Sequence, residues 1–493
     1  MQLNVRDYGA SGDGQTKDAV VIQAALDEAN RVKSGITVWI PEGTYRLEKT
    51  LYVSSKTHVI AAPGTRLVKD HNGYLVTNGR PEESFEKYSG HSDIVIEGGI
   101  WDFNGTKRKV MHNCFAFGHG DNITLEGMEI RDVAGAHAVE ICGCRNVRIS
   151  NCRFLGFINT GGRNFSEAVQ IDLMKAKWVF SAFGAYDQTP CDNVWISGCY
   201  FGSSGTDGSQ VWPRGIGSHS STIGVWHQNI KVQNNVFEGL TMQAVRGYSW
   251  RNVQIQHNQM ISCGAGIEAA SPILSDAKDT KNIFGKQTGG SQPCENIQIV
   301  HNTITGGLTY HHGIHLAGER SGVLANVLIS GNIISDPVQG SAFSGISIRH
   351  GQTVNVTNNI LGQIKGTSIA VEVGSRIVLN NNMITFAWGD GISVSDHVVG
   401  VDLKNNFLQY IWRNGIVISG NVGQVVILGN TIYGVNGEGS KTYPITAKLA
   451  NEMIISMNVY KNEGKKYHSD KALHIASSCR NVWENGNYFS GLT

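Results

Sequence analysis

The sequence has 493 residues and nearly balanced charge, with 41 Lys plus Arg, 40 Asp plus Glu and a formal net charge of +1. This balance argues against a general affinity for nucleic acid or for an acidic membrane surface. No apolar run approaches the roughly 18 residues that cross a bilayer, so we also expect no membrane insertion. Only 16% of the residues are charged and 60 are glycine, which favours strands and tight turns over helices.

The one strong helical pattern lies near the N-terminus, in residues 18–33, DAVVIQAALDEANRVK. Its apolar residues fall on one face, and Asp18 is placed as the N-cap. Alternating residues 36–53, ITVWIPEGTYRLEKTLYV, follow directly as strands. We therefore predict a cap segment over residues 1–35, whose helix closes the end of a strand-rich body.

A short repeat runs through most of the remaining chain. Examples are NITLEGMEI at 122, NVRISNCRF at 146, NVWISGCYF at 193 and NVLISGNII at 326, and copies continue to NVWENGNYF at 481. Each copy is a short alternating strand, a turn and a second short strand. Cys152 and Cys199 occupy the seventh position in two copies, and in most others it is Asn, namely Asn235, Asn258, Asn302, Asn332, Asn359, Asn382, Asn406, Asn430, Asn458 and Asn487.

A further strand lies between successive copies, as in HAVEIC, EAVQID and NGIVIS. Repeats of roughly 23 to 30 residues are too short for βαβ units, and propeller blades need about 40 residues. The pattern therefore predicts an all-β fold, a right-handed parallel β-helix capped by the N-terminal α-helix, with residues 36–493 as a single domain. Equivalent residues would stack at about 4.8 Å, and an interior Asn could bond the backbone of neighbouring coils.

The N-terminal sequence resembles that of a known superfamily. VRDYGASGDGQTKDAVVIQAALDEAN followed by VWIPEGTY is similar to the signature of pectate-lyase-like β-helix proteins. These include polygalacturonase-type glycosidases, bacterial polysaccharide depolymerases and bacteriophage tail spikes, among which homotrimers are usual. The resemblance implies the fold and leaves the chemistry open. The polygalacturonase motifs do not transfer, because GHG at 118–120 precedes every candidate acid and no R-I-K follows.

Written in register, the strands between the copies form three outward columns of polar residues. Charged side chains crowd the coils from 137 to 315, whereas the middle column continues as Ser347, Ala370, Ser393 and Val417. A merely solvated sheet face, the alternative for any single residue, has no reason to change character along its length. The candidate catalytic residues are Asp172, Glu140 and Glu167, and the candidate substrate-binding residues from these columns are Gln170, His219, Arg246, Glu268, His315 and Tyr248.

The spacing of the repeats supports a site on the same coils. Copies from 353 to 424 start about 23 or 24 residues apart, whereas the steps from 146 to 193 and from 252 to 296 are nearly twice as long. Long loops on a rigid scaffold commonly carry binding function. These loops also bring aromatic residues on which sugar rings can stack, and Trp212 is our candidate among them.

Glu140 and Asp172 would lie on adjacent coils, offset by two residues, so their backbones are roughly 8 Å apart. Inverting glycosidases separate their carboxyls by about 6.5–9.5 Å. We therefore predict a polysaccharide depolymerase, an endo-acting glycoside hydrolase with a carboxylate pair in a groove on the side of the β-helix. Glu140 or Glu167 would protonate the leaving oxygen and Asp172 would activate water. His219 could tune either pKa, and Arg246 could bind an acidic sugar.

Two other functions stay open. A polysaccharide lyase would act by β-elimination on a uronic acid, with His219 or His315 as base and Arg246 neutralising the carboxylate. A receptor-binding module would hold a glycan without cutting it. Mass analysis of the products distinguishes hydrolysis, elimination and simple binding.

The remaining expectations concern cofactors, partners and location. The nine cysteines are interpreted as small buried apolar residues, and CGC at 142–144 lacks a second Cys/His pair with zinc-like spacing, so we predict no metal and no cofactor. The N-terminus MQLNVRDYGA shows no signal peptide. Together with free cysteines and a β-helix, this predicts an extracellular or virion-associated, tail-spike-like protein whose partner is a polysaccharide. The resemblance to tail spikes implies that it is a homotrimer.

Overall fold

The computed structural model describes residues 2–31, 35–336, 342–439, 441–464 and 466–491. In these ranges the chain is built of strands, with one α-helix and one 3-10 helix. It divides into two compact units, unit 1 comprising 1–253 and 275–289, and unit 2 comprising 254–274 and 290–493. Unit 1 includes the N-terminal helix and the coils that follow it, and the boundary after residue 35 between a cap segment and a single β-helix domain stays a prediction.

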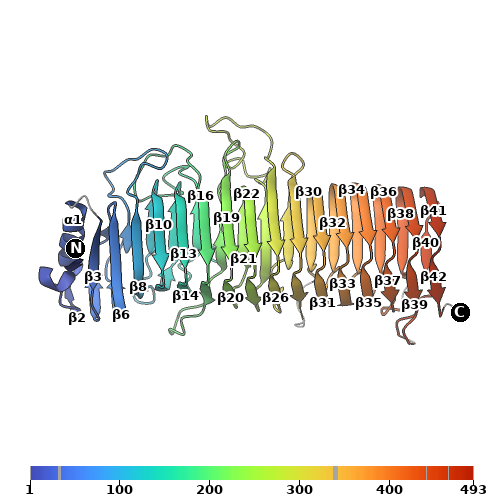
Figure 1. The fold of residues 1–493 in the computed structure, drawn as a ribbon, viewed down its shortest axis with the longest axis horizontal. Coiled ribbons are helices and arrows are strands. Elements are labelled where there is room, and N and C mark those ends of the chain that lie inside the picture. The colour runs from blue at the N-terminus through green and yellow to red at the C-terminus, as the bar shows by residue number, and fades with distance from the viewer. Residues whose placement is uncertain (1, 32–34, 337–341, 440, 465, 492–493) are drawn as a thin grey trace. The chain divides into compact units, whose positions relative to one another are not determined.

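The helix predicted over 18–33 is confirmed in its described part as α1 (Ala19–Arg31), which lies beside the first strands of unit 1 (Figure 1). Residues 32 and 33 of the prediction lie outside the described residues. Asp18 precedes it, and the Asp18 carbonyl accepts the Ile22 N–H as an N-cap does. Its carboxylate does not cap the helix, because it accepts the backbone N–H groups of Ser11 and Gly12 at 2.7 and 3.1 Å. Across the described ranges, no helix combines the length and apolar character that a membrane span requires.

Unit 1 is a stack of coils whose strands pair in parallel with their equivalents on the next coil (Figure 1). Its first elements are β1 (Gln2–Asn4), η1 (Val5–Tyr8), β2 (Asp13–Lys17), β3 (Ile36–Ile40), β4 (Thr44–Leu47), β5 (Leu51–Tyr52) and β6 (Thr57–Lys69). The strands that follow stack at equivalent positions of successive coils and form three sheets, which we call A, B and C. Sheet A contains β8 (Ile94–Asp102), β10 (Asp121–Glu126), β13 (Arg145–Ser150), β16 (Asp192–Ser197) and β19 (His227–Gln233). Sheet B contains β11 (Glu129–Ala134), β14 (Arg153–Ile158), β17 (Tyr200–Gly202) and β20 (Val236–Glu238). Sheet C contains β7 (Val76–Thr77), β9 (Phe115–Gly118), β12 (Val139–Cys142), β15 (Glu167–Asp172), β18 (Arg214–Gly217) and β21 (Gln243–Tyr248).

Unit 2 repeats this arrangement, and β22 (Trp250–Gln256) crosses from unit 1 into it along the chain. Its shorter strands are β23 (Gln259–Ile261), β24 (Ala265–Ala270), β25 (Cys294–Val300), β26 (Thr303–Thr305), β27 (Ile314–Ala317), β28 (Leu324–Ser330), β29 (Ile333–Ser335), β31 (Ile360–Ile364), β33 (Met383–Ala387), β35 (Phe407–Ile411), β37 (Thr431–Tyr433), β39 (Val459–Lys461), β40 (Leu473–Ile475), β41 (Arg480–Asn485) and β42 (Tyr488–Ser490). Five longer strands run without a break through two sides of a coil, namely β30 (Ile346–Thr357), β32 (Ile369–Asn380), β34 (Ile392–Lys404), β36 (Ile416–Leu428) and β38 (Ile445–Ser456).

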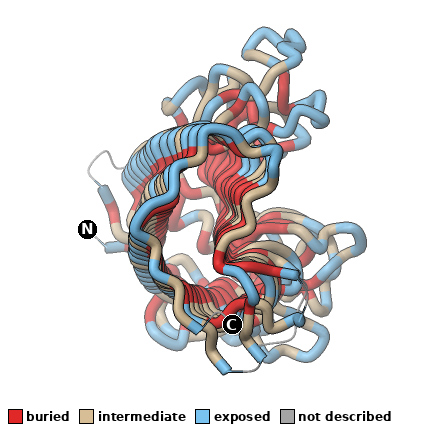
Figure 2. The backbone as a smooth tube through the Cα atoms, turned by 90° about the vertical axis from the view of Figure 1, so that its right-hand side faces the viewer, coloured by how far each residue is buried: buried red, intermediate tan, exposed pale blue. Residues whose placement is uncertain are grey.

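Alternation along each strand places the core inside the coils. In sheet A of unit 1, Ile123, Val147 and Val194 stand in register and are all buried, whereas Arg148 beside them is exposed. Figure 2 shows buried residues along the inner side of the coils. The cysteines are free thiols and eight of the nine are buried, which confirms the interpretation of cysteine as a core residue. Stacked apolar side chains, removed from water on every coil, therefore supply the main stabilisation.

The predicted asparagine ladder is present in unit 2. Each Asn side-chain amide donates to the side-chain oxygen of the Asn one coil further on, at 2.9–3.0 Å. The same oxygen also accepts the backbone N–H of the preceding Asn, and most of the amides also donate to a backbone carbonyl. The ladder comprises Asn258, Asn302, Asn332, Asn359, Asn382, Asn406, Asn430, Asn458 and Asn487. It satisfies the polar backbone groups that a buried turn would otherwise leave unpaired.

Asn359→Ala is expected to destabilise unit 2 by about 3 kcal/mol, because an unsatisfied buried polar group costs roughly 1–3 kcal/mol and several are created at once. The substitution removes the acceptor of the Asn332 side-chain and backbone N–H groups and the donor to the Ile329 carbonyl. Urea unfolding measures the change. Asn355→Ala, at an exposed position on the same coil, is the control and should stay within about 0.5 kcal/mol. Equal losses in both variants would mean that the ladder does not stabilise the turn.

Candidate active site

The candidate catalytic residues lie on adjacent strands of sheet C in unit 1. Glu140 is on β12, and both Glu167 and Asp172 are on β15. The register pairs Glu140 with Gln170 and Cys142 with Asp172, so Asp172 lies one coil beyond Glu140 and two residues further along the strand. The structure therefore has the offset that the sequence predicts. We call Glu140, Glu167, Gln170, Asp172 and His219 the carboxylate cluster.

The outward face that carries the cluster is covered, which corrects the expectation of a solvent-facing groove. Glu140 is 1% exposed, and Glu167 and Asp172 are 0% exposed. Residues 173–191, which we call the covering loop, join β15 to β16, and their apolar side chains pack on outward residues of sheet C. Phe180 and Phe183 of the covering loop belong to the same buried apolar group as Cys142 of sheet C. A loop that is long enough to fold back over its own strand can bury side chains that strand alternation alone would place in water.

The environment of Glu140 favours the neutral form of its carboxyl. Burial, together with the nearby charge of Asp172, raises the pKa of the Glu140 carboxyl well above its ordinary value. Asn113 is its one side-chain N–H donor among the described residues, and Asn113 also accepts the backbone N–H of His137 at 3.0 Å. A carboxyl group with few donors in a buried site favours its protonated form, the form that can act as an acid.

Asp172 has a different environment. Burial is the largest effect and raises the pKa of the Asp172 carboxyl above its ordinary value, while His219 and three hydrogen-bond donors limit that rise by favouring the ionised form. The donors are the Leu173 N–H at 2.8 Å, the Gln170 side-chain amide at 2.8 Å and the Ser220 hydroxyl. The two carboxyls therefore differ in the way that acid and base partners do, because Glu140 has one N–H donor and the weak Cys142 S–H, whereas Asp172 has three N–H or O–H donors.

Glu167 is the centre of a buried ion network. Burial alone would raise its pKa, but His219, Arg214 and His137 together hold the pKa of Glu167 well below its ordinary value. Arg214 Nη1 lies 3.3 Å from Oε1, and His219 Nδ1 lies 3.5 Å from Oε2. Glu167 in turn outweighs the effect of burial and raises the pKa of His219. This charge pairing favours a structural role that positions His219, whose side chain is 29% exposed.

Gln170 links the two carboxylate environments. Its amide nitrogen donates to Asp172, and its side-chain oxygen is buried without a hydrogen-bond partner among the described residues. An unpaired buried acceptor is uncommon and needs an explanation. A sugar hydroxyl or an ordered water molecule in the site would satisfy it.

The other sequence-predicted residues of unit 1 are Arg246, Tyr248 and Trp212, and each of them contacts other residues of the protein. Arg246 donates to the Ser218 carbonyl at 2.7 Å and lies over the ring of Tyr248 at 4.8 Å. The Tyr248 hydroxyl donates to Asp279 at 3.0 Å. Trp212 is fully buried, with its ring centroid 5.1 Å from that of Phe157, so it offers no face to a sugar in this conformation.

Glu268 and His315 belong to unit 2, on β24 and β27, where they are register partners. His315 is grouped with His311 and His312, which precede β27. Burial is the main cause that lowers the pKa of His315 to about 4 and that of His312 to about 3. Sequence reasoning named His315 as a candidate but did not connect the three histidines.

Sequence reasoning also missed partners that come from outside the repeat. Asn113 and Ser220 lie in connecting segments, and nothing in their spacing points to Glu140 or Asp172. Lys175, three residues after Asp172, donates to Asp279 at 2.7 Å and thereby joins the covering loop to residues 275–289. Trp178 is 60% exposed beside a pocket of about 310 Å³ that is lined by Lys175, Trp178, Gln188, Lys278, Lys281 and Asn282.

Comparison with known proteins assigns the chain to a family. Residues 2–268 match the family described as rhamnogalacturonase A/epimerase, pectate lyase-like. The chain belongs to the pectate-lyase-like β-helix proteins. Residues 287–444 match the right-handed β-helix region, which confirms both the fold and its predicted hand.

Individual relatives differ in what their names describe. The chain is 28% identical over 415 residues to plasmin and fibronectin-binding protein A of Streptococcus pneumoniae, covering 77% of this chain and 56% of that protein. It is 30% identical over 150 residues to alginate lyase 7 of Azotobacter vinelandii, covering 27% of this chain and 17% of the relative. The chain thus spans just over half of the first relative and a small part of the second.

A solved structure extends the likeness in fold. The tailspike protein of E. coli bacteriophage HK620, in complex with a pentasaccharide, matches with a TM-score of 0.62 and 14% identity, covering 98% of this chain and 80% of that chain. At this identity the match concerns the fold alone, so the site must be argued from its own residues.

Proposed function

We propose that the protein is a carbohydrate-active enzyme, an endo-acting glycoside hydrolase that uses Glu140 as general acid and Asp172 as general base. The observation that carries this proposal is the contrast between two buried carboxyls on neighbouring coils, one with a single N–H donor and a weak thiol donor and one with three N–H or O–H donors. Environments that push the pKa values of two acids apart are typical of acid and base pairs. The predicted backbone separation of roughly 8 Å leaves room for a water molecule, as inversion requires.

In this mechanism Glu140 donates its proton to the glycosidic oxygen as the bond to the anomeric carbon breaks. Asp172 accepts a proton from the water that attacks the same carbon from the opposite face. The Gln170 side-chain oxygen can accept a sugar hydroxyl, and Trp178 offers an exposed ring for stacking. Because Glu140 and Asp172 are covered, substrate entry requires the covering loop to move away from sheet C.

A second candidate function is β-elimination from a uronic acid. His219 favours it, since it is the member of the cluster with substantial exposure and is held by the buried Glu167. The partial relationship to alginate lyase 7 points the same way. In that reaction His219 would remove the proton next to the uronate carboxyl, and Arg246 would stabilise the resulting negative charge.

Incubation with a panel of bacterial capsules and of plant and microbial glycans, followed by mass spectrometry, tests the proposal. Hydrolysis adds the mass of one water per cleaved bond. Elimination adds no mass and produces an unsaturated end that absorbs ultraviolet light. We expect the first outcome; the second would assign the site to His219. Glycan binding without products would instead favour a receptor-binding module; the name of the Streptococcus pneumoniae relative also describes binding, in its case of plasmin and fibronectin.

We further propose that the protein works outside the cell or on a virion, as a tail-spike-like homotrimer bound to polysaccharide. The fold likeness to a phage tailspike supports this location and partner. Light scattering coupled to size-exclusion chromatography measures the oligomeric state, and a monomer would remove the trimer from the proposal.

A further inference from the structure

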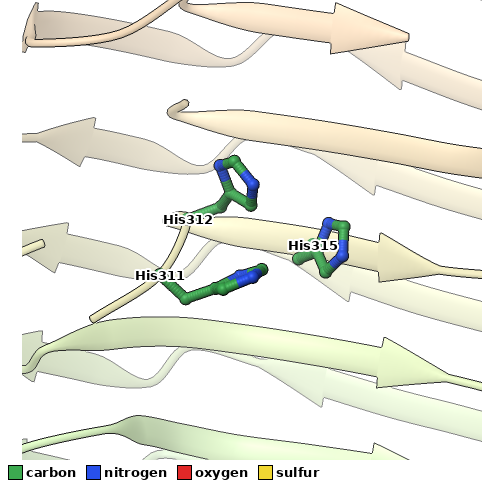
Figure 3. A group of neighbouring side chains, drawn as sticks. All are labelled: His311, His312 and His315. Atoms are coloured by element: carbon green, nitrogen blue, oxygen red, sulfur yellow. The ribbon is translucent and has the colours of Figure 1, made fainter. Parts of the chain in front are cut away.

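Three histidines of unit 2 form a compact group on the outer side of one coil (Figure 3). His315 projects from β27, and His311 and His312 come from the segment that leads into this strand. Their ring centroids lie 4.5 Å apart for His311 and His312, 4.7 Å for His311 and His315, and 5.0 Å for His312 and His315. One ring nitrogen from each residue lies within 4.8 Å of the other two.

We propose that His311, His312 and His315 bind a divalent transition-metal ion of the zinc class. Imidazole nitrogen suits zinc, copper, nickel and iron, and three protein ligands with one open position are the usual pattern of a reactive zinc site. Zinc lies about 2.1 Å from each nitrogen, which sets tetrahedral ligands about 3.4 Å apart. The ligand nitrogens therefore need to approach by up to about 1.4 Å, a change within the reach of side-chain rotation.

The hydrogen bonds of the group leave ligand atoms available. Nδ1 of His311 and Nδ1 of His315 are buried without hydrogen-bond partners among the described residues. Buried polar atoms of this kind often mark an ion or water that completes the site. Nδ1 of His312 accepts the Ser344 backbone N–H at 2.8 Å, so the His312 ring must release this hydrogen bond to coordinate. The loss of one neutral hydrogen bond is small beside the gain of metal–nitrogen bonds.

The surroundings fit a cation. Glu268 is the register partner of His315 and interacts electrostatically with all three histidines. A buried carboxylate beside a histidine site favours the positive ion. The Phe343 ring stacks on His311 at 5.6 Å and limits where that ring can turn. All three histidines are partly exposed, so an ion can reach them from solvent.

Titration calorimetry on the full chain, without an affinity tag and after dialysis against a chelator, tests the site. We expect one Zn²⁺ per chain and no comparable binding of Mg²⁺ or Ca²⁺, which prefer oxygen ligands. His311→Ala with His315→Ala should weaken zinc binding by more than about 100-fold, and Glu268→Gln by about tenfold. The visible spectrum of bound Co²⁺ gives a second readout, and its bands should disappear in the double histidine variant.

The matched control uses His257 and His301, a histidine pair of unit 2 whose rings are 5.2 Å apart and for which the described residues provide no third ligand. His257→Asn with His301→Asn keeps residues that tolerate their left-handed backbone and should bind zinc like the parent chain. Thermal unfolding with and without zinc checks folding, since zinc should raise the Tm of the parent and control only. Unchanged zinc binding in the His311 and His315 variant, or no binding by the parent chain, would overturn the proposal.

Discussion

Glu140→Gln is expected to reduce the rate of polysaccharide cleavage by about 100- to 10,000-fold, the usual contribution of a general acid. Glutamine keeps the shape of the side chain and can still contact Asn113, but it has no acidic proton to give to the leaving oxygen. Asp172→Asn should cause a loss of similar size, because the amide cannot accept the proton of water. Both variants should still bind the polysaccharide, so kcat falls much more than affinity. Product release measured by reducing ends, with binding measured separately, gives both quantities.

Glu372→Gln is the matched control for this experiment. Glu372 also lies on an outward position of the same repeated strand, on β32, but it is exposed and remote in sequence from the carboxylate cluster. Its replacement should leave cleavage unchanged. If Glu140→Gln and Asp172→Asn retain full activity while His219→Gln loses it, the acid and base assignment is wrong and His219 carries the chemistry.

Glu167→Gln is expected to destabilise unit 1 by about 3–5 kcal/mol, because breaking a buried ion pair leaves the remaining charges uncompensated. The charges concerned are those of Arg214 and protonated His219, 3.3 and 3.5 Å from the Glu167 carboxylate. Urea unfolding of the parent and the variant measures the difference. The same Glu372→Gln control should shift stability by no more than about 0.5 kcal/mol.

The stability lost in Glu167→Gln should depend on pH in a defined direction. The folded pKa of Glu167 is lowered from 4.5, so its contribution is present above 4.5 and is lost as the pH falls through the folded value. The folded pKa of His219 is raised from 6.5, so its contribution is present below 6.5 and is lost as the pH rises through the folded value. The difference between parent and variant should therefore be largest between 4.5 and 6.5. A difference that keeps growing above that window would contradict the pairing of Glu167 with His219.

The sequence by itself determined the coil architecture of this protein. A β-helix repeats the same local environment on every coil, so inward apolar residues and the turn asparagines recur at fixed spacing. Asn332, Asn359 and Asn382 could therefore be assigned to one ladder from the sequence alone. The register of Glu140 against Gln170 followed from the same periodicity. The α1 helix was equally predictable from the sequence, because its apolar face and the preceding Asp18 are local features.

Only the tertiary structure decided what surrounds those residues. The covering loop obeys no period, so its packing over Cys142 and the burial of Asp172 could not be read from strand alternation. The donor Ser220 and the metal-type grouping of His311 with His315 likewise depend on how irregular segments fold against the coils. Periodic contacts are encoded in the repeat itself, whereas contacts of loops depend on long-range packing that differs at every coil. For that reason the sequence identified the candidate carboxylates, while their protonation, their partners and their access to substrate were set by the fold.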